Sequence, residues 1–584
     1  MNGKKEDMQI LNNLLKLFKP FKLKIILVII CITMSAGLSI LTPTVNQRLM
    51  DEGLIAKNLK IIITYSICNL ILIMIIQGLG IIETKYRSYI ENLLSYNLEE
   101  QAFTHTLKMK MSFFLSTNYA EIMNNLKIDI GNISQIVDQS TFYIVTSIFR
   151  IIVGIIGLIT IDWRLSILVL IATPLRYLIV KYLAKKRRNL FERFINSYED
   201  FSGWYGDTIG GIKEIKIWGL ELSKTGQFIK KQKEIIKQNI RMSYLAKANE
   251  ISETVFTQAI TSLIYVIGGY LIIGNSLTVG RLFAFIAYSS YVTGPIFAIM
   301  NIGYSFAGIM PSAKRYFEFI NTETEDICRN YISKKLNSSE VLGNIEFKNV
   351  EFSYNDKECV LKNISFKINA GEKVAIIGSN GSGKTTVINL ILRFLTPDSG
   401  SILLDGNDIN SFKLKDYRKL ISVVSQDVYL FNSSIRENIM LNSKKTDIEM
   451  NSAVKKSGAY RFIEEMPDKY ESIVGQRGGT LSGGERQKIA MARAFIRDSK
   501  ILVLDEATAN YDMEAEYQVN NIIKESYKDK TIIIISHKPD ILAKVDKIIV
   551  INNGVIEDIG NHIDLYNRSE FYRLMVNIPL DEII

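Results

Sequence analysis

The chain has 584 residues, which is too long for a single hydrophobic core, so several domains are expected. Hydrophobic residues make up 47% of the chain and charged residues 22%, with a formal net charge of +10. Because much of the basic excess lies beside long apolar segments, it predicts contact with an anionic lipid bilayer and argues against a nucleic-acid partner.

The first predicted element is a short helix within residues 1–22. Its apolar residues, among them Ile10 and Leu14, recur with helical spacing between lysines. This pattern is typical of an interfacial helix that lies in the plane of the membrane surface. We expect Pro20 to end the helix, because proline cannot donate a helical hydrogen bond.

Six long apolar runs follow, in a predicted transmembrane domain of residues 23–320. Each run is close to the ~20 residues that a helix needs to cross ~30 Å of hydrocarbon. Runs of this length favour an α-helical transmembrane domain over the alternative of buried helices in a soluble protein. The runs lie at residues 23–43, 60–82, 140–161, 165–184, 254–274 and 282–310.

The loops between the runs predict their orientation. Long polar segments at residues 85–138 and 185–250 begin with lysine and arginine, whereas the short loops hold few basic residues. Basic residues mark the cytoplasmic side, so the N-terminus and both long segments are expected in the cytoplasm, with the spans in the plasma or inner membrane. The long segments keep apolar helical spacing, which predicts that the spans continue as helices beyond the bilayer.

Two arginines lie deep within the predicted spans. Arg150 and Arg176 are each about eleven residues from the outer end of their span, or about 16 Å at helical rise. No Asp or Glu lies at a similar depth, so neither arginine has an expected partner. We interpret both as candidate substrate contacts in a water-filled cavity that accepts an anionic group. The alternatives are snorkelling towards the interface and hydrogen bonds to carbonyls near Pro174.

The composition changes in the second half of the chain. Residues 321–343 form a polar linker, and a second domain is predicted at residues 344–584. The run from Ile345 to Tyr354 alternates apolar and polar residues like a half-buried strand, and later strand patterns interleave with helical ones. These patterns predict a C-terminal α/β domain with its own core.

Residues 378–385 read Gly-Ser-Asn-Gly-Ser-Gly-Lys-Thr, the spacing of a phosphate-binding P-loop. A predicted strand precedes the loop and a predicted helix follows it, so phosphate would lie at a helix N-terminus. Lys384 can reach the β- and γ-phosphates, and Thr385 can hold Mg²⁺. The alternative is an ordinary glycine-rich turn. The predicted nucleotide-binding residues of this P-loop NTPase domain are Gly378, Ser379, Asn380, Gly381, Ser382, Gly383, Lys384, Thr385 and Thr386.

The partners that a P-loop requires also follow apolar runs. Asp505 and Glu506 end a predicted buried strand, where the first carboxylate can bind Mg²⁺ through water and the second can polarise the attacking water. Gln426 and His537 each follow another predicted strand. We predict a catalytic and metal-binding role for Gln426 and a γ-phosphate contact for His537, with a buried core histidine as the alternative.

Residues 481–487 read Leu-Ser-Gly-Gly-Glu-Arg-Gln. Ser482, Gly483 and Gly484 open a predicted helix and offer a hydroxyl and backbone N–H groups to an anion. The run resembles the signature of ATP-binding cassette (ABC) proteins, and the other motifs occur in the order of that family. The resemblance covers nearly the whole chain.

Six spans fused to one C-terminal ABC domain resemble an exporter-type half-transporter. The resemblance implies a dimer in which the signature of one copy completes the ATP site of the other; a homodimer is favoured and a heterodimer stays open. It implies that Tyr354 stacks on adenine, with an ordinary strand aromatic as the alternative. It also implies that segments near Ser116–Leu126 and Tyr205–Ile215 couple the ABC domain to the membrane.

The sequence departs from the family pattern at two places. The run from Ala507 to Asp512 reads Ala-Thr-Ala-Asn-Tyr-Asp where Ala-Thr-Ser-Ala-Leu-Asp is usual, and Gln476 replaces a common glutamate. Neither change removes Glu506 or Lys384, so ATP hydrolysis is still expected.

The expected function is ATP-driven export or flipping of an amphipathic peptide, lipid or drug by alternating access, with ATP and Mg²⁺ as cofactors. Three alternatives remain: an ATP-gated channel or membrane sensor, an importer with the same architecture, and a soluble ABC ATPase that acts on ribosomes or DNA. An intact Glu506 argues against the first, and six spans argue against the third.

Overall fold

The computed structural model describes residues 2–116, 119–137, 139–325, 340–354, 358–441, 443–508, 511 and 529–576. These residues form two compact units, which are best described separately. The first unit holds the N-terminal helices. The second holds the chain from Glu323 onward and a short segment that begins at Lys108.

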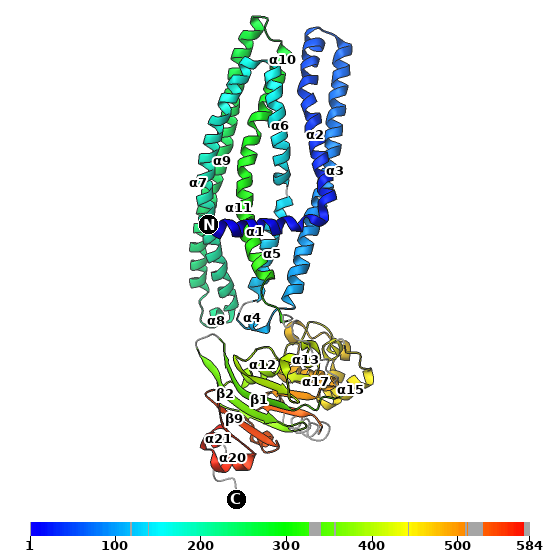
Figure 1. Ribbon diagram of the computed structural model, residues 1–584, viewed down its shortest axis with the longest axis vertical. Helices are drawn as coiled ribbons and strands as arrows, with labels where there is room; N and C mark the ends of the chain where they lie inside the picture. Colours follow the sequence, from blue (N-terminus) through cyan, green and yellow to red (C-terminus); the bar gives the residue numbers. More distant parts are fainter. Residues whose placement is uncertain are drawn as a thin grey trace. The chain divides into compact units, whose positions relative to one another are not determined.

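The first unit is a bundle of long helices, with α1 lying across the others (Figure 1). A short 3-10 turn that contains Pro20 joins α1 to α2, which confirms that the first helix ends before this proline. The helices are α1 (Asn2–Leu17), α2 (Lys22–Arg48), α3 (Leu59–Thr106), α5 (Tyr119–Ser134), α6 (Gln139–Ile161), α7 (Trp163–Gly210), α8 (Ile212–Ile217), α9 (Glu221–Ile273), α10 (Val279–Thr293) and α11 (Pro295–Ile320).

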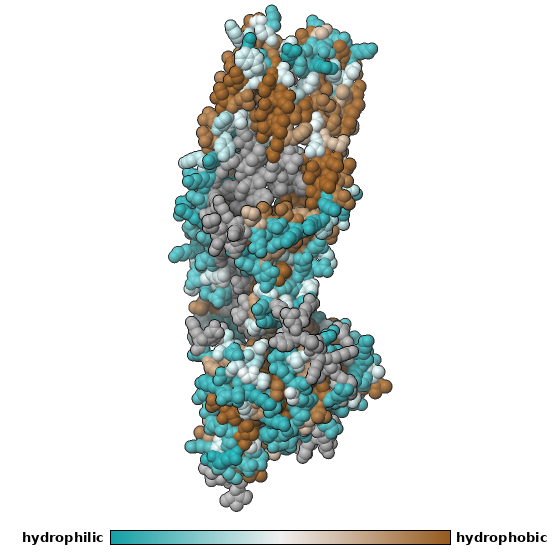
Figure 2. Space-filling model, viewed as in Figure 1, coloured by the Kyte–Doolittle hydropathy of each residue, from teal (hydrophilic) through white to brown (hydrophobic). Residues whose placement is uncertain are grey.

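Three helices of this unit are far longer than a bilayer is thick. α3 and α7 have 48 residues each and α9 has 53, which corresponds to about 72–80 Å at helical rise. The prediction that spans continue beyond the membrane as helices is therefore confirmed. Figure 2 shows that hydrophobic side chains gather on the part of the unit that lies on the opposite side of α1 from α8, and that hydrophilic side chains are more frequent between α1 and α8.

The predicted spans agree with the helices, except for the last. Within the described residues, four helices are long and apolar enough to cross a membrane, and they coincide with the first, second, fourth and fifth predicted spans. α6 covers the third span. The sixth, at residues 282–310, comprises most of α10 and part of α11, which meet at Gly294 and Pro295, where the backbone of Gly294 keeps helical angles (φ −61°, ψ −49°). Proline lacks the N–H that would continue the helix but suits the first position of a new one.

Tyrosines of α10 complete the backbone hydrogen bonding of α2. Pro43 in α2 cannot donate to the carbonyl of Ser39, four residues earlier. Instead the hydroxyl of Tyr291 donates to that carbonyl at 2.9 Å, and the hydroxyl of Tyr288 donates to the carbonyl of Ile40 at 2.9 Å. Backbone groups in hydrocarbon require such partners, so these bonds attach α10 to α2 at the break.

The hairpins at the far end of the long helices differ from the predicted coupling segments. The short helix α8 lies within the turn between α7 and α9, in agreement with part of the predicted segment Tyr205–Ile215. Between α3 and α5 the chain turns earlier than predicted and forms α4 (Met111–Ser116). The predicted coupling segment Ser116–Leu126 begins at the last residue of α4, and most of its described part belongs to α5 (Tyr119–Ser134).

The segment around α4 is held by ion pairs and a bridge within the second unit. Met109 forms an isolated β-bridge with Thr324, and the N–H of Glu325 donates to the carbonyl of Lys108 at 2.8 Å. The carboxylate of Glu325 also forms a bidentate pair with Arg418, at 2.8 and 2.9 Å. A bidentate Arg–carboxylate pair fixes geometry as well as charge, so this segment is attached firmly to the α/β domain.

The α/β domain contains two sheets. In the six-stranded sheet the order is β10-β9-β3-β8-β7-β6, and all neighbours are parallel except β10. The four-stranded sheet has the order β2-β1-β4-β5 and is antiparallel. The strands are β1 (Ile345–Ser353), β2 (Cys359–Ile368), β3 (Lys373–Ile377), β4 (Ser399–Leu404), β5 (Asn407–Asp408), β6 (Ile421–Val424), β7 (Ile501–Asp505), β8 (Thr531–Ile535), β9 (Lys547–Asn552) and β10 (Val555–Gly560).

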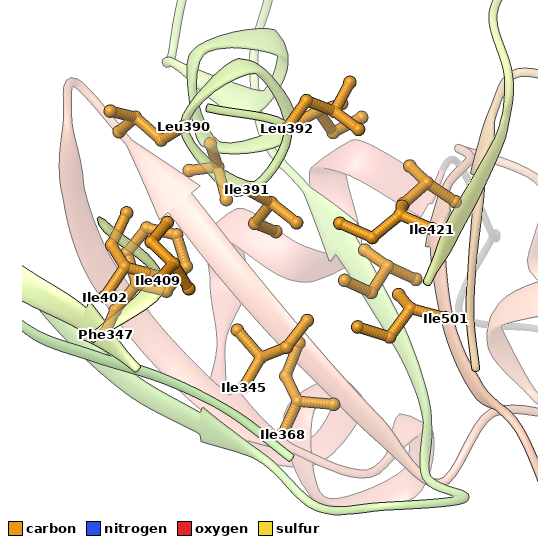
Figure 3. Packing of buried hydrophobic residues seen from close by; sticks show 14 of the residues in the cluster. Ile345, Phe347, Ile368, Leu390, Ile391, Leu392, Ile402, Ile409, Ile421 and Ile501 are labelled. Carbon is orange, nitrogen blue, oxygen red and sulfur yellow. The ribbon is translucent and has the colours of Figure 1, made fainter. Parts of the chain in front are cut away.

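Strand residues alternate between two cores on opposite faces of the six-stranded sheet. Ile501 and Val503 of β7 face a core that packs against the four-stranded sheet and α12 (Figure 3). Leu502 and Leu504 face a second core, which is covered by helices that include α15 and α17. The helices of the domain are α12 (Lys384–Ile391), α13 (Leu414–Lys419), α14 (Ile435–Met440), α15 (Asp447–Lys456), α16 (Tyr460–Glu465), α17 (Gly483–Ile496), α19 (Pro539–Leu542), α20 (His562–Arg568) and α21 (Glu570–Val576).

Candidate functional site

The P-loop connects β3 to α12, as the sequence predicts. Gly381 and Gly383 have φ values of 80° and 104°, in the left-handed region that side chains disfavour. A Cβ on Gly383 would lie 2.5 Å from Leu361 Cδ2, and one on Gly378 would lie 2.1 Å from the carbonyl oxygen of Ile551. Glycine is therefore required for packing at two positions of this loop.

The polar side chains of the P-loop have distinct environments. Lys384 Nζ donates to the carbonyls of Gly378 and Ser379, at 2.7 and 2.9 Å. Thr385 is exposed, whereas Ser382 is buried and its hydroxyl oxygen has no hydrogen-bond partner among the described residues. A buried hydroxyl without a partner is costly, and a bound phosphate oxygen would satisfy it.

Tyr354 reaches the same region from the end of β1. Its hydroxyl lies 3.1 Å from Thr386 Oγ1, and its ring, 49% exposed, packs edge-on against Phe352. The exposed ring is free to stack on a base. Asn380 is exposed at the tip of the loop.

The remaining candidate residues are gathered at one edge of the parallel sheet. β3, β8, β7 and β6 are neighbours, so the residues that follow their carboxyl ends lie close together. Gln426 Nε2 donates to Glu506 Oε2 at 2.6 Å. Glu506 has φ 48°, which is rare for a non-glycine residue and typical of functional sites. The N–H of Glu506 is fixed by the carbonyl of Ile535 at the end of β8, at 3.0 Å.

Electrostatic effects connect the charged members of the site. Burial raises the pKa of Asp505, and the Glu506 carboxylate adds to this while Lys384 opposes it. Burial lowers the pKa of Lys384, against the effect of Glu506 and Asp505. Burial and then Lys384 lower the pKa of His537 below its ordinary 6.5, while Glu506 opposes the shift. The four groups are thus mutually close, and His537 is neutral at neutral pH.

Ser482 is the N-cap of α17, which confirms that the signature opens a helix. Its hydroxyl oxygen accepts from the N–H of Glu485 at 3.3 Å, and its own N–H donates to Glu485 Oε2 at 2.7 Å. Because the oxygen acts only as an acceptor in this capping box, the hydroxyl proton can still be donated to an anion. Ser482 is exposed, and Gly483 and Gly484 are partly exposed.

Gln487 is a residue that the sequence analysis missed. It lies on α17, is 2% exposed, and its Nε2 is 3.5 Å from the carbonyl oxygen of Glu506. The signal was a glutamine at a buried position of the signature helix. Gln476 is exposed, and half of the altered run from Ala507 to Asp512, residues 509, 510 and 512, lies outside the described residues.

The membrane arginines have different surroundings. Arg176 is 2% exposed, and its NH2 atom lies 2.9 Å from Glu253 Oε1 of α9. The expectation that Arg176 lacks an acidic partner is therefore wrong, because Glu253 precedes the fifth predicted span by one residue. This contact has the distance of an ion pair without the angles of a hydrogen bond, since no guanidinium nitrogen of Arg176 is hydrogen-bonded to a described residue. Arg150 lies 5.9 Å from the centroid of the Tyr291 ring.

Comparisons with known proteins agree with this architecture. Residues 25–296 match the family model of the ABC transporter transmembrane region, and residues 361–509 match that of the ABC transporter domain. YgaD of Bacillus subtilis (strain 168), provisionally named a multidrug export ATP-binding/permease protein, is 30% identical over 83% of both chains. The ATP-dependent lipid A-core flippase of Escherichia coli (strain K12) is 28% identical over 95% of both chains.

The fold also matches a solved structure, that of a bacterial Atm1-family ABC exporter with ATP bound. The TM-score is 0.81 at 22% identity, over 95% of this chain and 97% of the other. The chain has one membrane region and one ATP-binding domain. A complete exporter of this type has two of each, which implies that the chain functions as a dimer. The chain thus belongs to the ABC transporter family and is an exporter-type half-transporter, in which an ATPase drives transport across a membrane.

Proposed function

We propose that two copies of this chain form a homodimer that exports or flips an amphipathic substrate with an anionic group, from the cytoplasmic side of the cell membrane. The observation that carries the proposal is the complete hydrolytic set of one copy, centred on the 2.6 Å hydrogen bond between Gln426 and Glu506. A homodimer of such chains has two competent ATP sites and does not require a second, different subunit.

In each site, ATP would lie on the P-loop of one copy and the signature of the other. Lys384 would exchange its bonds to the loop carbonyls for bonds to phosphate oxygens. Ser482 and the N-terminus of α17 would donate to the phosphates of the partner's nucleotide. Tyr354 would stack on the adenine.

Hydrolysis would then use Glu506 to orient and polarise the attacking water, with Gln426 holding the carboxylate in place. His537, which is neutral, would contact the γ-phosphate as a hydrogen-bond donor. The backbone of Glu506 is strained, and its N–H is held by the carbonyl at the end of β8. The residue that orients the water would therefore lie at the same edge of the sheet as the residues that bind ATP.

The oxygen donors at this edge suit Mg²⁺. Asp505, Thr385 and Gln426 offer a carboxylate, a hydroxyl and an amide oxygen, which are the ligand types that this hard cation prefers. Mg²⁺ would supply charge neutralisation of the β- and γ-phosphates. Burial raises the pKa of Asp505, and the neighbouring Lys384 ammonium opposes this shift.

The substrate class follows from the membrane region and from relatives. Several relatives at 28–29% identity are named lipid A-core flippases, which supports an amphipathic lipid or a compound of similar shape. Arg150, which is partly exposed, would contact the anionic group. Because Glu253 partly neutralises Arg176, the contribution of Arg176 to anion preference is smaller than that of Arg150.

The test is transport in liposomes that contain the purified protein. Wild type, Glu506→Gln and Arg150→Gln would be compared for ATP-dependent movement of labelled anionic lipids, zwitterionic lipids and peptides. We expect no movement with Glu506→Gln, and with Arg150→Gln a selective loss for anionic substrates and of their stimulation of ATP hydrolysis. Equal transport of anionic substrates by wild type and Arg150→Gln would refute the anion preference, and transport by Glu506→Gln would refute ATP-driven export.

A further inference from the structure

A groove with a basic and aromatic lining lies between the start of α2 and the middle of α3. Its volume is about 720 Å³, which is within the range of small-molecule sites. α2 and α3 pack directly against each other, so both walls belong to the same unit. The side chains that matter most are Lys24 of α2 and Lys85, Tyr86, Tyr89, Asn92 and Tyr96 of α3.

The position of α1 gives the depth of this groove in the membrane. α2 begins at Lys22, directly after the turn that follows α1, so Lys24 lies only about 3 Å along the helix from that level. Figure 1 shows α1 crossing the bundle where α2 begins, and Figure 2 shows hydrophobic side chains beyond this level. Tyrosine and lysine are the residues that collect at a membrane–water boundary. The groove therefore lies at the boundary on the α1 side.

The face of α3 that lines the groove is positively charged. At 100° per residue, Lys85, Tyr89 and Tyr96 lie within about 40° of one another on α3. Glu83 and Glu91 lie on the other side of the helix, more than about 120° from this face. Glu83 is also paired with Arg87, at 3.0 Å. Among the described residues, no acidic side chain lines the groove.

The lining also offers a place for both parts of a lipid. Lys24 Nζ lies 3.6 Å from the centroid of the Tyr89 ring, so the ammonium group is held at the groove while its N–H donors stay available. Beyond the groove, towards the hydrophobic part of the bundle, Ile81 and Met74 of α3 are 72% and 66% exposed, and at 100° per residue both lie within about 40° of Lys85. Acyl chains can pack on these residues while the headgroup meets the lysines.

We propose that this groove binds an anionic phospholipid, with its phosphate between Lys24 and Lys85 and its chains along the exposed Ile81 and Met74. That this lipid comes from the inner leaflet rests on the membrane orientation given in the proposed function. Basic pockets between membrane helices at this depth are suited to anionic headgroups, whereas a zwitterionic headgroup would gain less from two lysines. The lipid is a ligand of the outer surface of one α2–α3 pair, separate from Arg150 and from the transported substrate.

Binding of spin-labelled phosphatidylglycerol and phosphatidylcholine to the purified full-length protein tests the proposal. We expect wild type to prefer phosphatidylglycerol, and Lys24→Gln/Lys85→Gln to weaken its binding by roughly 25-fold, the equivalent of about 1 kcal/mol per lysine. Lys57→Gln/Lys60→Gln is the matched control, since it removes two exposed lysines from the other end of the same helix pair. Its binding should equal that of wild type.

Two further measurements distinguish a phospholipid site from a site for a free anion. Glycerol 3-phosphate, which has the anion without the chains, should not displace the lipid; displacement at similar concentration would mean a free-anion site and overturn the proposal. Tyr89→Phe should bind as wild type does and Tyr89→Leu less well, because only the ring is required. Equal affinity of wild type for both lipids, or unchanged binding in the Lys24/Lys85 variant, would also overturn it. Because these readouts do not depend on ATP, they are independent of the transport test.

Discussion

Gln426 and Glu506 are joined by a hydrogen bond of 2.6 Å, from Nε2 to Oε2, although 80 residues separate them in the chain. The bond forms because β6 and β7 are adjacent parallel strands that end at the same edge of the sheet. A carboxylate held in this way has one oxygen occupied and one available for water. The pair therefore fixes the direction from which water can approach the nucleotide.

Replacement of Glu506 by Gln should lower the rate of ATP hydrolysis by at least about 100-fold, because the amide cannot polarise water. Binding of ATP should be retained, since the P-loop is unchanged. Phosphate release and equilibrium binding of labelled ATP are the measurements. Glu557→Gln, an exposed carboxylate of β10, is the matched control and should hydrolyse ATP at the wild-type rate. Residual hydrolysis above about a tenth of wild type would contradict the role of Glu506.

The pH dependence of ATP hydrolysis should reflect the lowered pKa of His537. A lowered pKa means that the imidazole stays neutral until the pH falls below its ordinary 6.5. If neutral His537 is required, kcat/KM for ATP should fall in acidic solution with a midpoint below pH 6.5, because kcat/KM reports the free enzyme. His537→Gln should lower activity and remove this limb. A midpoint above pH 6.5 would contradict the argument.

Alanine at Gly383 should abolish detectable ATP binding, whereas alanine at Gly381 should weaken it only modestly. Both positions have positive φ, which costs a side chain roughly 1–2 kcal/mol. Only at Gly383 does the added Cβ also clash, at 2.5 Å from Leu361; at Gly381 it meets open space. The pair of variants thus separates backbone strain from collision. Similar binding by the two variants would show that the clash is relieved by a shift of Leu361.

Replacement of Tyr291 by Phe should destabilise the membrane region by about 1 kcal/mol, the usual scale for one hydrogen bond between membrane helices. The variant removes the donor to the Ser39 carbonyl, which Pro43 leaves without a helical partner. Thermal unfolding in detergent is the measurement. Tyr270→Phe, which removes a hydroxyl from a residue that is 78% exposed, should leave the unfolding temperature unchanged. Equal effects of both variants would exclude a specific role for the Tyr291 hydroxyl.

Glu253→Gln should lower the unfolding temperature, because it leaves the buried guanidinium of Arg176 without its counter-charge. The double variant Arg176→Gln/Glu253→Gln should recover part of this loss, since no isolated charge remains. A double-mutant cycle on unfolding measures the coupling between the two residues. Strict additivity of the two single effects would mean that the ion pair contributes nothing.

Much of the nucleotide site could be predicted from sequence because it depends on local patterns. The P-loop, Asp505 with Glu506, Gln426 and His537 each follow a short apolar run, and parallel strands bring such ends to one edge. The bond between Gln426 and Glu506 could not be predicted, since strand order is not readable from periodicity. Gln487 was missed for the same reason, because its contact depends on the packing of α17 beneath β7.

In the membrane half, apolar length predicted the spans but not their partners. Glu253 was overlooked because it lies just before an apolar run, whereas α7 and α9 are long enough to place it beside Arg176. The boundary between α10 and α11 within the sixth span could not be predicted from hydropathy, which does not register the missing N–H of Pro295.

The tyrosine hydroxyls of α10 have a consequence for solvent in the bilayer. They supply hydrogen bonds to the carbonyls of Ser39 and Ile40 in α2. Parting α2 from α10 would leave the Ser39 carbonyl bare in hydrocarbon, at a cost of several kcal/mol, because Pro43 cannot donate to it. Water that enters between the helices removes this cost. Separation of α2 from α10 should therefore be accompanied by entry of water, and the space between the two helices would become hydrated in the same step.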